Sequence, residues 1–124
     1  MTEKPVKVPG PDHPITIQAN PRRVTVSVGG RQIADSRRAL TLQEASYPAV
    51  QYIPRADVDM AALGRTEHAT YCPYKGDCSY YSLTDLGERG ANAVWTYETP
   101  YPAVGAIKDH LAFYPDRTQI AESD

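Results

Sequence analysis

The segment from Thr70 to Tyr81 gathers most of the side chains in this sequence that could do chemistry. It runs Thr-Tyr-Cys-Pro-Tyr-Lys-Gly-Asp-Cys-Ser-Tyr-Tyr, so thiols, an ammonium group, a carboxylate and four phenols lie within twelve residues. At the tip of a hairpin loop, the Lys75 ammonium and the Gly76 backbone N–H would suit an anion such as phosphate. The alternatives are that Lys75 is an ordinary solvated loop charge and that Gly76 supplies a positive φ.

The two cysteines flank the loop 73–77 within this segment. In a simple hairpin Cys72 and Cys78 would face each other, close enough to oxidise to a disulfide in vitro. Neutral packing of two small side chains is the alternative to a nucleophile or a redox switch. The Cys-x-x-Cys pairs of zinc ribbons do not occur in the sequence, and we expect no metal site.

Aromatic side chains form the second group of interest, with nine Tyr beside one Trp and one Phe. Trp95 and Tyr97 are two residues apart and would share one face of a strand. A buried Tyr needs a partner for its hydroxyl, so the excess of Tyr over Phe favours rings at a wet boundary. A concave aromatic face would suit a planar base or a small polar metabolite, although plain core packing is the alternative. Four arginines could supply a cationic rim: Arg37, Arg38, Arg55 and Arg65.

Short strands must position these groups. Apolar alternation over 24–28 and 31–35, about Gly29-Gly30, predicts a β-hairpin. We expect further strands over 39–44, 49–53 and 93–97, a second hairpin from 68–72 and 78–83, and a closing hairpin from 110–114 and 117–121. A short helix is predicted over 57–63, capped by Asp57 and stopped by Gly64, and a helical turn over 102–108.

The chain of 124 residues is long enough for one domain with one core. Five prolines within residues 1–21 remove backbone donors, so we expect that no ladder propagates there and that this segment is a proline-rich arm. Residues 22–124 would then form a single β-rich domain. The pattern predicts a compact, mainly antiparallel β fold of seven or eight short strands, as a small barrel or two packed sheets, with one or two short helices.

Charge and hydropathy limit the partners. The net charge of −2 and the pI near 5.9 argue against a protein held by duplex nucleic acid. No apolar run approaches the roughly 20 residues that span a bilayer, and the first residues do not resemble a secretion signal. We therefore expect a cytoplasmic protein without a membrane partner, as a monomer or a homodimer.

Several motifs together resemble one known family. They are Arg38-Ala-Leu-x-Leu-x-Glu44, Thr70-x-Cys-Pro-Tyr-Lys-Gly76 followed by Tyr80-Tyr81-Ser82, and Trp95-x-Tyr97-x-x-Pro100. Over about residues 23–120 the chain is similar to the bacterial and fungal family filed as domain of unknown function 427. The resemblance implies a compact, mostly antiparallel β domain, and the family sometimes carries a nucleotidyltransferase label.

We predict a small-molecule binding module for a nucleotide-like or planar anionic ligand. The expected ligand-binding residues are Tyr71, Cys72, Tyr74, Lys75, Gly76, Tyr80, Trp95, Tyr97 and Arg38. One alternative is an enzyme of the nucleotidyltransferase type, for which Asp57 and Asp59 are the nearest carboxylate pair for Mg²⁺. Another is a homodimeric interaction domain built on a strand edge or on the arm. The sequence identifies neither a cofactor nor a catalytic residue.

Overall fold

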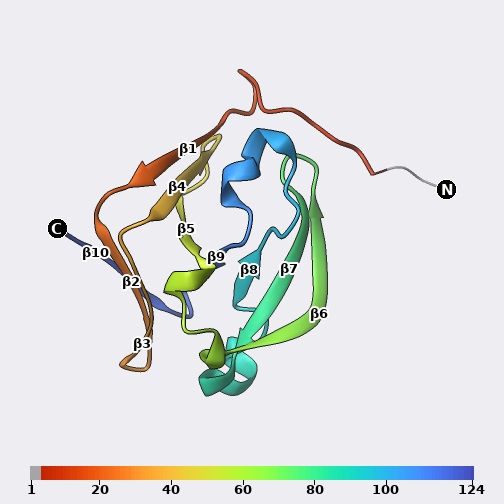
Figure 1. Cartoon of the computed structure of the whole chain (residues 1–124). Coiled ribbons are helices and arrows are strands. Elements are labelled where there is room, and N and C mark those ends of the chain that lie inside the picture. Colours follow the sequence, from red (N-terminus) through yellow and green to blue (C-terminus); the bar gives the residue numbers. More distant parts are fainter. Residues whose placement is uncertain (1–3) are drawn as a thin grey trace.

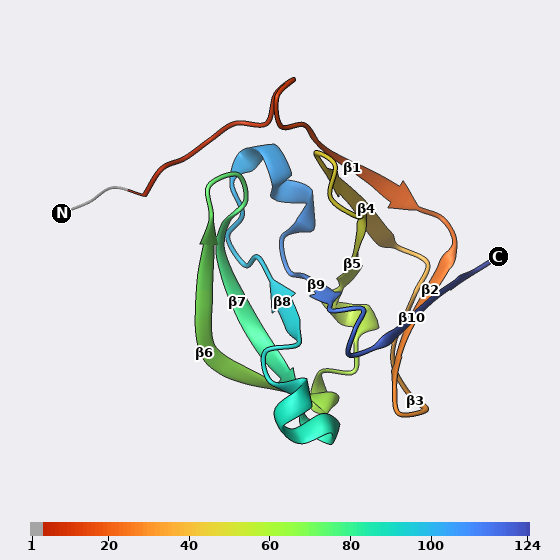
Figure 2. The same ribbon diagram turned by 180° about the vertical axis from the view of Figure 1, so that it is seen from behind.

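The computed structural model describes residues 4–124, and these form ten strands in two antiparallel sheets connected by loops and 3-10 turns (Figures 1 and 2). The prediction of a mainly antiparallel β fold is confirmed, in its version with two sheets rather than a closed barrel. The strands are more numerous than the seven or eight expected, and the N-terminal segment supplies one of them, β1.

The larger sheet has seven strands in the spatial order β1-β4-β5-β9-β8-β7-β6. Their bounds are β1 Ile15–Asn20, β4 Ala39–Glu44, β5 Val50–Pro54, β6 Leu63–Cys72, β7 Gly76–Leu83, β8 Val94–Thr96 and β9 His110–Phe113. The prediction that no ladder propagates through residues 1–21 is wrong over β1, which pairs with β4 along its whole length. Pro14 and Pro21 flank this edge strand instead of interrupting it, and an edge position tolerates nearby proline. Whether the rest of that segment acts as a separate arm stays a prediction.

The smaller sheet has the order β10-β2-β3, with β2 Arg23–Val28, β3 Arg31–Ser36 and β10 Gln119–Ser123. The predicted first hairpin is confirmed, and its turn residues Gly29 and Gly30 have φ values of 54° and 85°, which only glycine adopts freely. The predicted closing hairpin is wrong. β9 pairs with β5 and β8 in the larger sheet, whereas β10 pairs with β2.

Two hydrophobic clusters cover the two faces of the larger sheet, where the sequence led us to expect a single core. Alternation along each strand divides its side chains between them. Val94 and Leu111 belong to the cluster that packs against the smaller sheet, while Trp95 and Ala112 point into the cluster on the opposite face. This second cluster holds most of the aromatic residues singled out from the sequence.

Four 3-10 segments connect the strands: η1 Arg55–Asp57, η2 Met60–Ala62, η3 Thr84–Gly90 and η4 Pro102–Ile107. The helical turn predicted over 102–108 is confirmed by η4, but the continuous helix predicted over 57–63 is wrong. The chain is extended at Val58, which forms a bridge with Ala34, and the Asp59 N–H donates to the Ile33 carbonyl at 2.7 Å. Asp59, rather than Asp57, caps the second turn.

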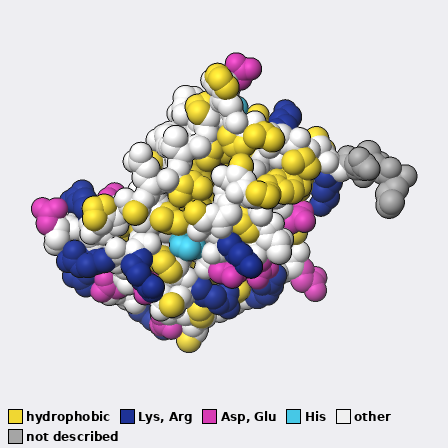
Figure 3. All heavy atoms as spheres, turned by 45° about the horizontal axis from the view of Figure 1, so that its top comes forward, with side chains coloured by type: hydrophobic (Ala, Val, Ile, Leu, Met, Phe, Trp, Pro, Cys, Tyr) yellow, Lys and Arg dark blue, Asp and Glu magenta, His cyan; other side chains and the backbone are white. Residues whose placement is uncertain are grey.

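The described residues before β1, from Lys4 on, run across the turn between β6 and β7 (Figure 1). The Lys7 N–H donates to the Pro73 carbonyl at 2.9 Å, and the Tyr71 hydroxyl donates to the Pro5 carbonyl at 2.6 Å. Figure 3 brings this part of the molecule forward and shows hydrophobic side chains gathered there, with charged side chains mainly around and below them. In the part of the chain that is described, no helix combines the length and apolar character needed to cross a membrane.

The close approach of η3 to β7 leads to a first prediction. Gly90 is buried, and a Cβ atom there would lie 2.2 Å from the Leu83 carbonyl oxygen. Because backbone must move to relieve that overlap, we expect Gly90→Ala to lower the free energy of unfolding by about 1–3 kcal/mol or more. Urea denaturation measures this. Gly105→Ala is the matched control, since nothing lies within 4 Å of its Cβ position, and equal stability of the two variants would contradict the prediction.

Candidate functional site

A cavity of about 220 Å³ opens on the face of the larger sheet that points away from the smaller sheet. Strands β4, β5, β7 and β8 form its floor, and the loops after β4, β6 and β9 complete the wall. The lining residues are Leu42, Glu44, Tyr47, Pro48, Val50, Tyr52, Lys75, Cys78, Tyr80, Trp95, Tyr97 and Tyr114. Six of these twelve are aromatic, so the cavity is a ring-lined pocket with one charged corner.

The aromatic rings are held by their own polar atoms as well as by packing. The Trp95 Nε1–H donates to the Tyr52 hydroxyl at 3.1 Å, and the Tyr80 hydroxyl lies 2.9 Å from the Thr70 hydroxyl. The Trp95 and Tyr114 rings are in contact, with centroids 4.6 Å apart. Burial raises the pKa of Tyr80 to about 12 and raises the pKa values of Tyr52 and Tyr97 as well. These phenols therefore stay neutral near pH 7.

An ion pair forms the charged corner. The Lys75 ammonium donates to Glu44 Oε1 at 2.8 Å, and both side chains are only 13% exposed. The other oxygen of the same carboxylate, Oε2, lies 2.7 Å from His13 Nε2, and the His13 ring stacks on Tyr74 at 4.1 Å between centroids. Lys75 is thus not the solvated loop charge that the sequence allowed. Its side chain folds back over the sheet, with Nζ 5.5 Å from the centre of the Tyr97 ring.

Two opposing effects set the pKa of the Glu44 carboxyl. Burial raises this pKa, whereas the hydrogen bonds from Lys75 and His13 and their charges lower it, and together the lowering effects are larger. The net result is a pKa below the ordinary glutamate value. Glu44 is therefore ionised at neutral pH in spite of its burial.

The turn that carries Lys75 is shorter than the predicted loop. Cys72 pairs with Gly76, so only residues 73–75 lie between the strands. Gly76 has a φ of 109°, which accords with its interpretation as a residue chosen for backbone freedom. A Cβ atom there would also lie 3.4 Å from the Thr99 carbonyl oxygen, so the backbone of residues 99–101 packs closely against this turn.

The structure brings four of the nine predicted ligand-binding residues into this cavity: Lys75, Tyr80, Trp95 and Tyr97. The other five lie elsewhere. The Tyr71 hydroxyl contacts the Tyr101 hydroxyl at 2.6 Å, and Arg38 forms an ion pair with Asp57 at 2.8 Å. Tyr74 supports the His13 ring from outside, while Cys72 and Gly76 belong to the strand ends beside the turn.

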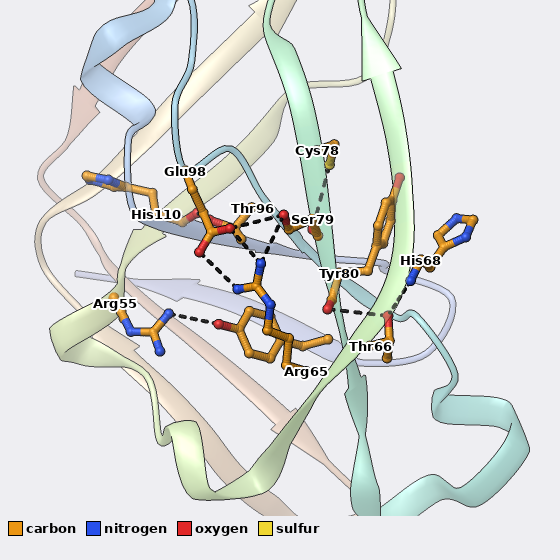
Figure 4. A network of polar contacts seen from close by, with 11 residues as sticks. Arg55, Arg65, Thr66, His68, Cys78, Ser79, Tyr80, Thr96, Glu98 and His110 are labelled. Carbon is orange, nitrogen blue, oxygen red and sulfur yellow. Dashed lines mark hydrogen bonds and ion pairs between the residues drawn. The ribbon is translucent and has the colours of Figure 1, made fainter.

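The predicted arginine rim does not form around this cavity. Arg55 and Arg65 lie on the opposite face of the sheet, where both guanidinium groups flank the Tyr81 ring at 5.8 Å from its centre (Figure 4). Arg65 is paired there with Glu98 at 2.8 Å. Tyr80 and Tyr81 are neighbours in the chain and therefore point to opposite faces, which separates the arginine cluster from the aromatic cavity.

The cysteines do not oppose each other as predicted. Because Cys72 pairs with Gly76, Cys78 pairs with Thr70, and the two thiols occupy diagonal positions. Diagonal neighbours in a sheet have Cα atoms about 7–8 Å apart, beyond the usual reach of a disulfide. Both cysteines are free. Burial raises the pKa of the Cys78 thiol, which argues against its use as a nucleophile.

Sequence reasoning missed several residues of the cavity, above all Glu44. The sequence did carry a signal for Glu44. Leu40, Leu42 and Glu44 lie at every second position of β4 and so share one face of the strand, and a charged side chain at the end of an apolar face needs a partner. Tyr47 and Pro48 gave no comparable signal, since they lie in a loop without periodicity. Tyr114 follows β9, and its contact with Trp95 depends on pairing between distant segments.

The fold and the site define a small two-sheet β domain with a ring-lined cavity and a partly buried ion pair. The profile of the family described as "Domain of unknown function (DUF427)" matches residues 16–124, and the chain belongs to this family. The resemblance drawn from the sequence motifs is confirmed. The short name of the family refers to nucleotidyl transfer. A search of curated proteins found no match to the chain.

The carboxylates considered for Mg²⁺ are not arranged as a pair facing the cavity. Asp57 accepts hydrogen bonds from Arg38 and Ser36, whereas Asp59 pairs with Arg31 at 3.1 Å and caps η2. Asp57 contacts Ser36 at the end of β3 and the following Arg38, whereas Asp59 contacts Arg31 at the start of β3. Among residues 4–124 no group of three or more potential metal-ligating side chains gathers.

The partly buried ion pair predicts a large effect of Lys75→Ala. Removing one partner of such a pair leaves the Glu44 charge uncompensated, so we expect a loss of about 3 kcal/mol in the free energy of unfolding. Chemical denaturation measures it. Lys108→Ala is the control, because Lys108 is exposed and forms no ion pair among the residues described. If both variants lost less than about 0.5 kcal/mol of unfolding free energy, the ion pair would not contribute to the stability of the fold.

The lowered pKa of Glu44 predicts a pH dependence of stability. An ionised carboxylate with a folded pKa below its unfolded value stabilises the fold above the unfolded pKa of about 4.3. That stabilisation is lost as the pH falls through the lower folded pKa. The difference in unfolding free energy between the wild type and Glu44→Gln should therefore be constant near neutral pH and shrink below about pH 4. A difference that grew on acidification would have the wrong sign.

Proposed function

We propose that this protein is a binding module for a small planar molecule, with a nucleobase, free or within a nucleotide, as the class that fits best. The observation that supports the proposal most directly is a partly buried Lys75–Glu44 pair in the wall of a cavity otherwise made largely of aromatic rings. Aromatic walls favour a planar ring, and a few polar groups then fix its orientation.

The ion pair favours a particular hydrogen-bonding edge. The Lys75 ammonium has three N–H donors and gives one of them to Glu44, while the carboxylate oxygens keep unused lone pairs. A ligand edge with one acceptor and one adjacent donor would match both groups. All the common nucleobases carry such an edge on their pairing side: adenine, cytosine, guanine, uracil and thymine.

The charge balance and the size of the cavity refine this choice. The positive charge of Lys75 is matched by Glu44, so a neutral ring suits the cavity better than an anionic group. The volume of about 220 Å³ lies below the roughly 300–1,000 Å³ typical of pockets for drug-sized ligands. It suits one base rather than a dinucleotide, and the phosphates of a nucleotide ligand would remain outside.

Calorimetric titration with adenine, cytosine, guanine, uracil and thymine, and with their nucleosides and 5′-monophosphates, tests the proposal. We expect at least one base to bind, and to bind about as tightly when it carries a phosphate. A thermal-shift series gives an independent readout, because a ligand at 100 times its Kd stabilises the folded state by about 2.7 kcal/mol. Absence of heat and of stabilisation at millimolar concentration for all of them would refute the proposal.

Tyr47→Ala is the variant best suited to locate the site. Tyr47 lines the cavity but is 58% exposed, so its removal should leave the fold intact. We expect this variant to weaken binding by at least threefold. Tyr101→Ala is the matched control, because Tyr101 contacts Tyr71 away from the cavity. Equal weakening by both variants would place the ligand elsewhere.

A further inference from the structure

A second cavity, of about 470 Å³, lies directly beside the first one. Its wall is mainly apolar and comes from the start of β5, the end of β9 and the strand β10. Ala49, Phe113, Pro115 and Ile120 are apolar residues that line this cavity and not the first one. Ile120 lies on the edge strand β10, and it is 37% exposed at this cavity.

The two cavities are adjacent parts of one site, because four residues line both of them. These shared residues are Tyr47, Pro48, Val50 and Trp95. The ion pair belongs to the first cavity alone, since neither Lys75 nor Glu44 lines the second. The Lys75 ammonium lies 5.5 Å from the centre of the Tyr97 ring, and Tyr97 lines the first cavity but not the second.

The polar atoms of the second cavity are largely committed to protein partners. Gln51 Oε1 accepts hydrogen bonds from Asn20 and Thr41, at 3.1 Å and 3.0 Å. Glu122 accepts one from Asn20 at 2.8 Å. With these groups engaged, the second cavity offers a ligand chiefly apolar contact.

We propose that the ligand has two parts: a planar ring with a donor–acceptor edge in the first cavity and an apolar substituent in the second. This inference rests on the proposed function and adds the chemical class of the substituent, an alkyl or aryl group on the side of the ring opposite the edge. An unmodified base would fill only the smaller cavity and leave the larger one to water.

A homologous series tests the inference. The base that binds best is compared in its methyl, butyl and hexyl forms, alkylated at the nitrogen that carries the ribose in nucleosides, and Kd is measured from Trp95 fluorescence. Trp95 is the one tryptophan of the sequence and lines both cavities, so it reports on either. We expect affinity to rise by up to about fourfold for each added CH₂ until the second cavity is filled.

Ala49→Phe should separate the two cavities. Ala49 is exposed and lines only the second cavity, so a phenyl ring there should abolish the gain from the hexyl chain and leave the methyl form unaffected. Ala121→Phe is the matched control, because Ala121 is exposed on the same edge of the protein and lines neither cavity. Ile120→Ser provides a second variant, which should reduce the gain by removing apolar surface.

The outcomes distinguish this inference from the proposed function. If no base binds, both fail. If bases bind without any gain from alkylation, only the two-part ligand is refuted. A gain that persists unchanged in Ala49→Phe and Ile120→Ser would also refute it, because the alkyl chain would then lie outside the second cavity.

Discussion

One carboxylate joins three segments that are far apart in the sequence. Glu44 ends β4, and it accepts hydrogen bonds from Lys75 in the β6–β7 turn and from His13 in the segment before β1. A charge that is largely removed from water must be matched by close partners, or its desolvation is not offset. The positions of the N-terminal segment, the edge of the larger sheet and the second hairpin are therefore interdependent, and the cavity exists where they meet.

Alternation along the strands gives the larger sheet two chemically different faces. The face toward the smaller sheet combines an aliphatic core with the Arg65–Glu98 cluster at its margin, whereas the other face carries the rings of Tyr52, Tyr80 and Trp95. A shift of one residue in the pairing of β7 would exchange Tyr80 with Tyr81 between the two faces of the sheet. Register, more than composition, thus determines which rings a ligand would meet.

The sequence was informative where the governing interactions are local. The Gly29-Gly30 turn, the alternation of Trp95 with Tyr97 and the Pro102 helical turn were predicted correctly, because each depends on a few adjacent residues. The Lys75–Glu44 contact spans 31 positions, and the pairing of β10 with β2 spans most of the chain. Such contacts are decided by the packing of whole sheets. The three-residue turn likewise sets the cysteine register in a way that spacing alone did not reveal.

The position of β10 has a consequence for how the chain reaches its native state. This strand completes the smaller sheet beside β2, and the Asn20–Glu122 hydrogen bond joins residues 102 positions apart. Pairing over such separations requires the closure of a long loop before any contact compensates for the lost entropy, and topologies of this kind fold slowly. During synthesis on the ribosome, β2 would emerge long before its partner, with one edge unpaired. The smaller sheet is therefore the region where transient association between nascent chains would begin.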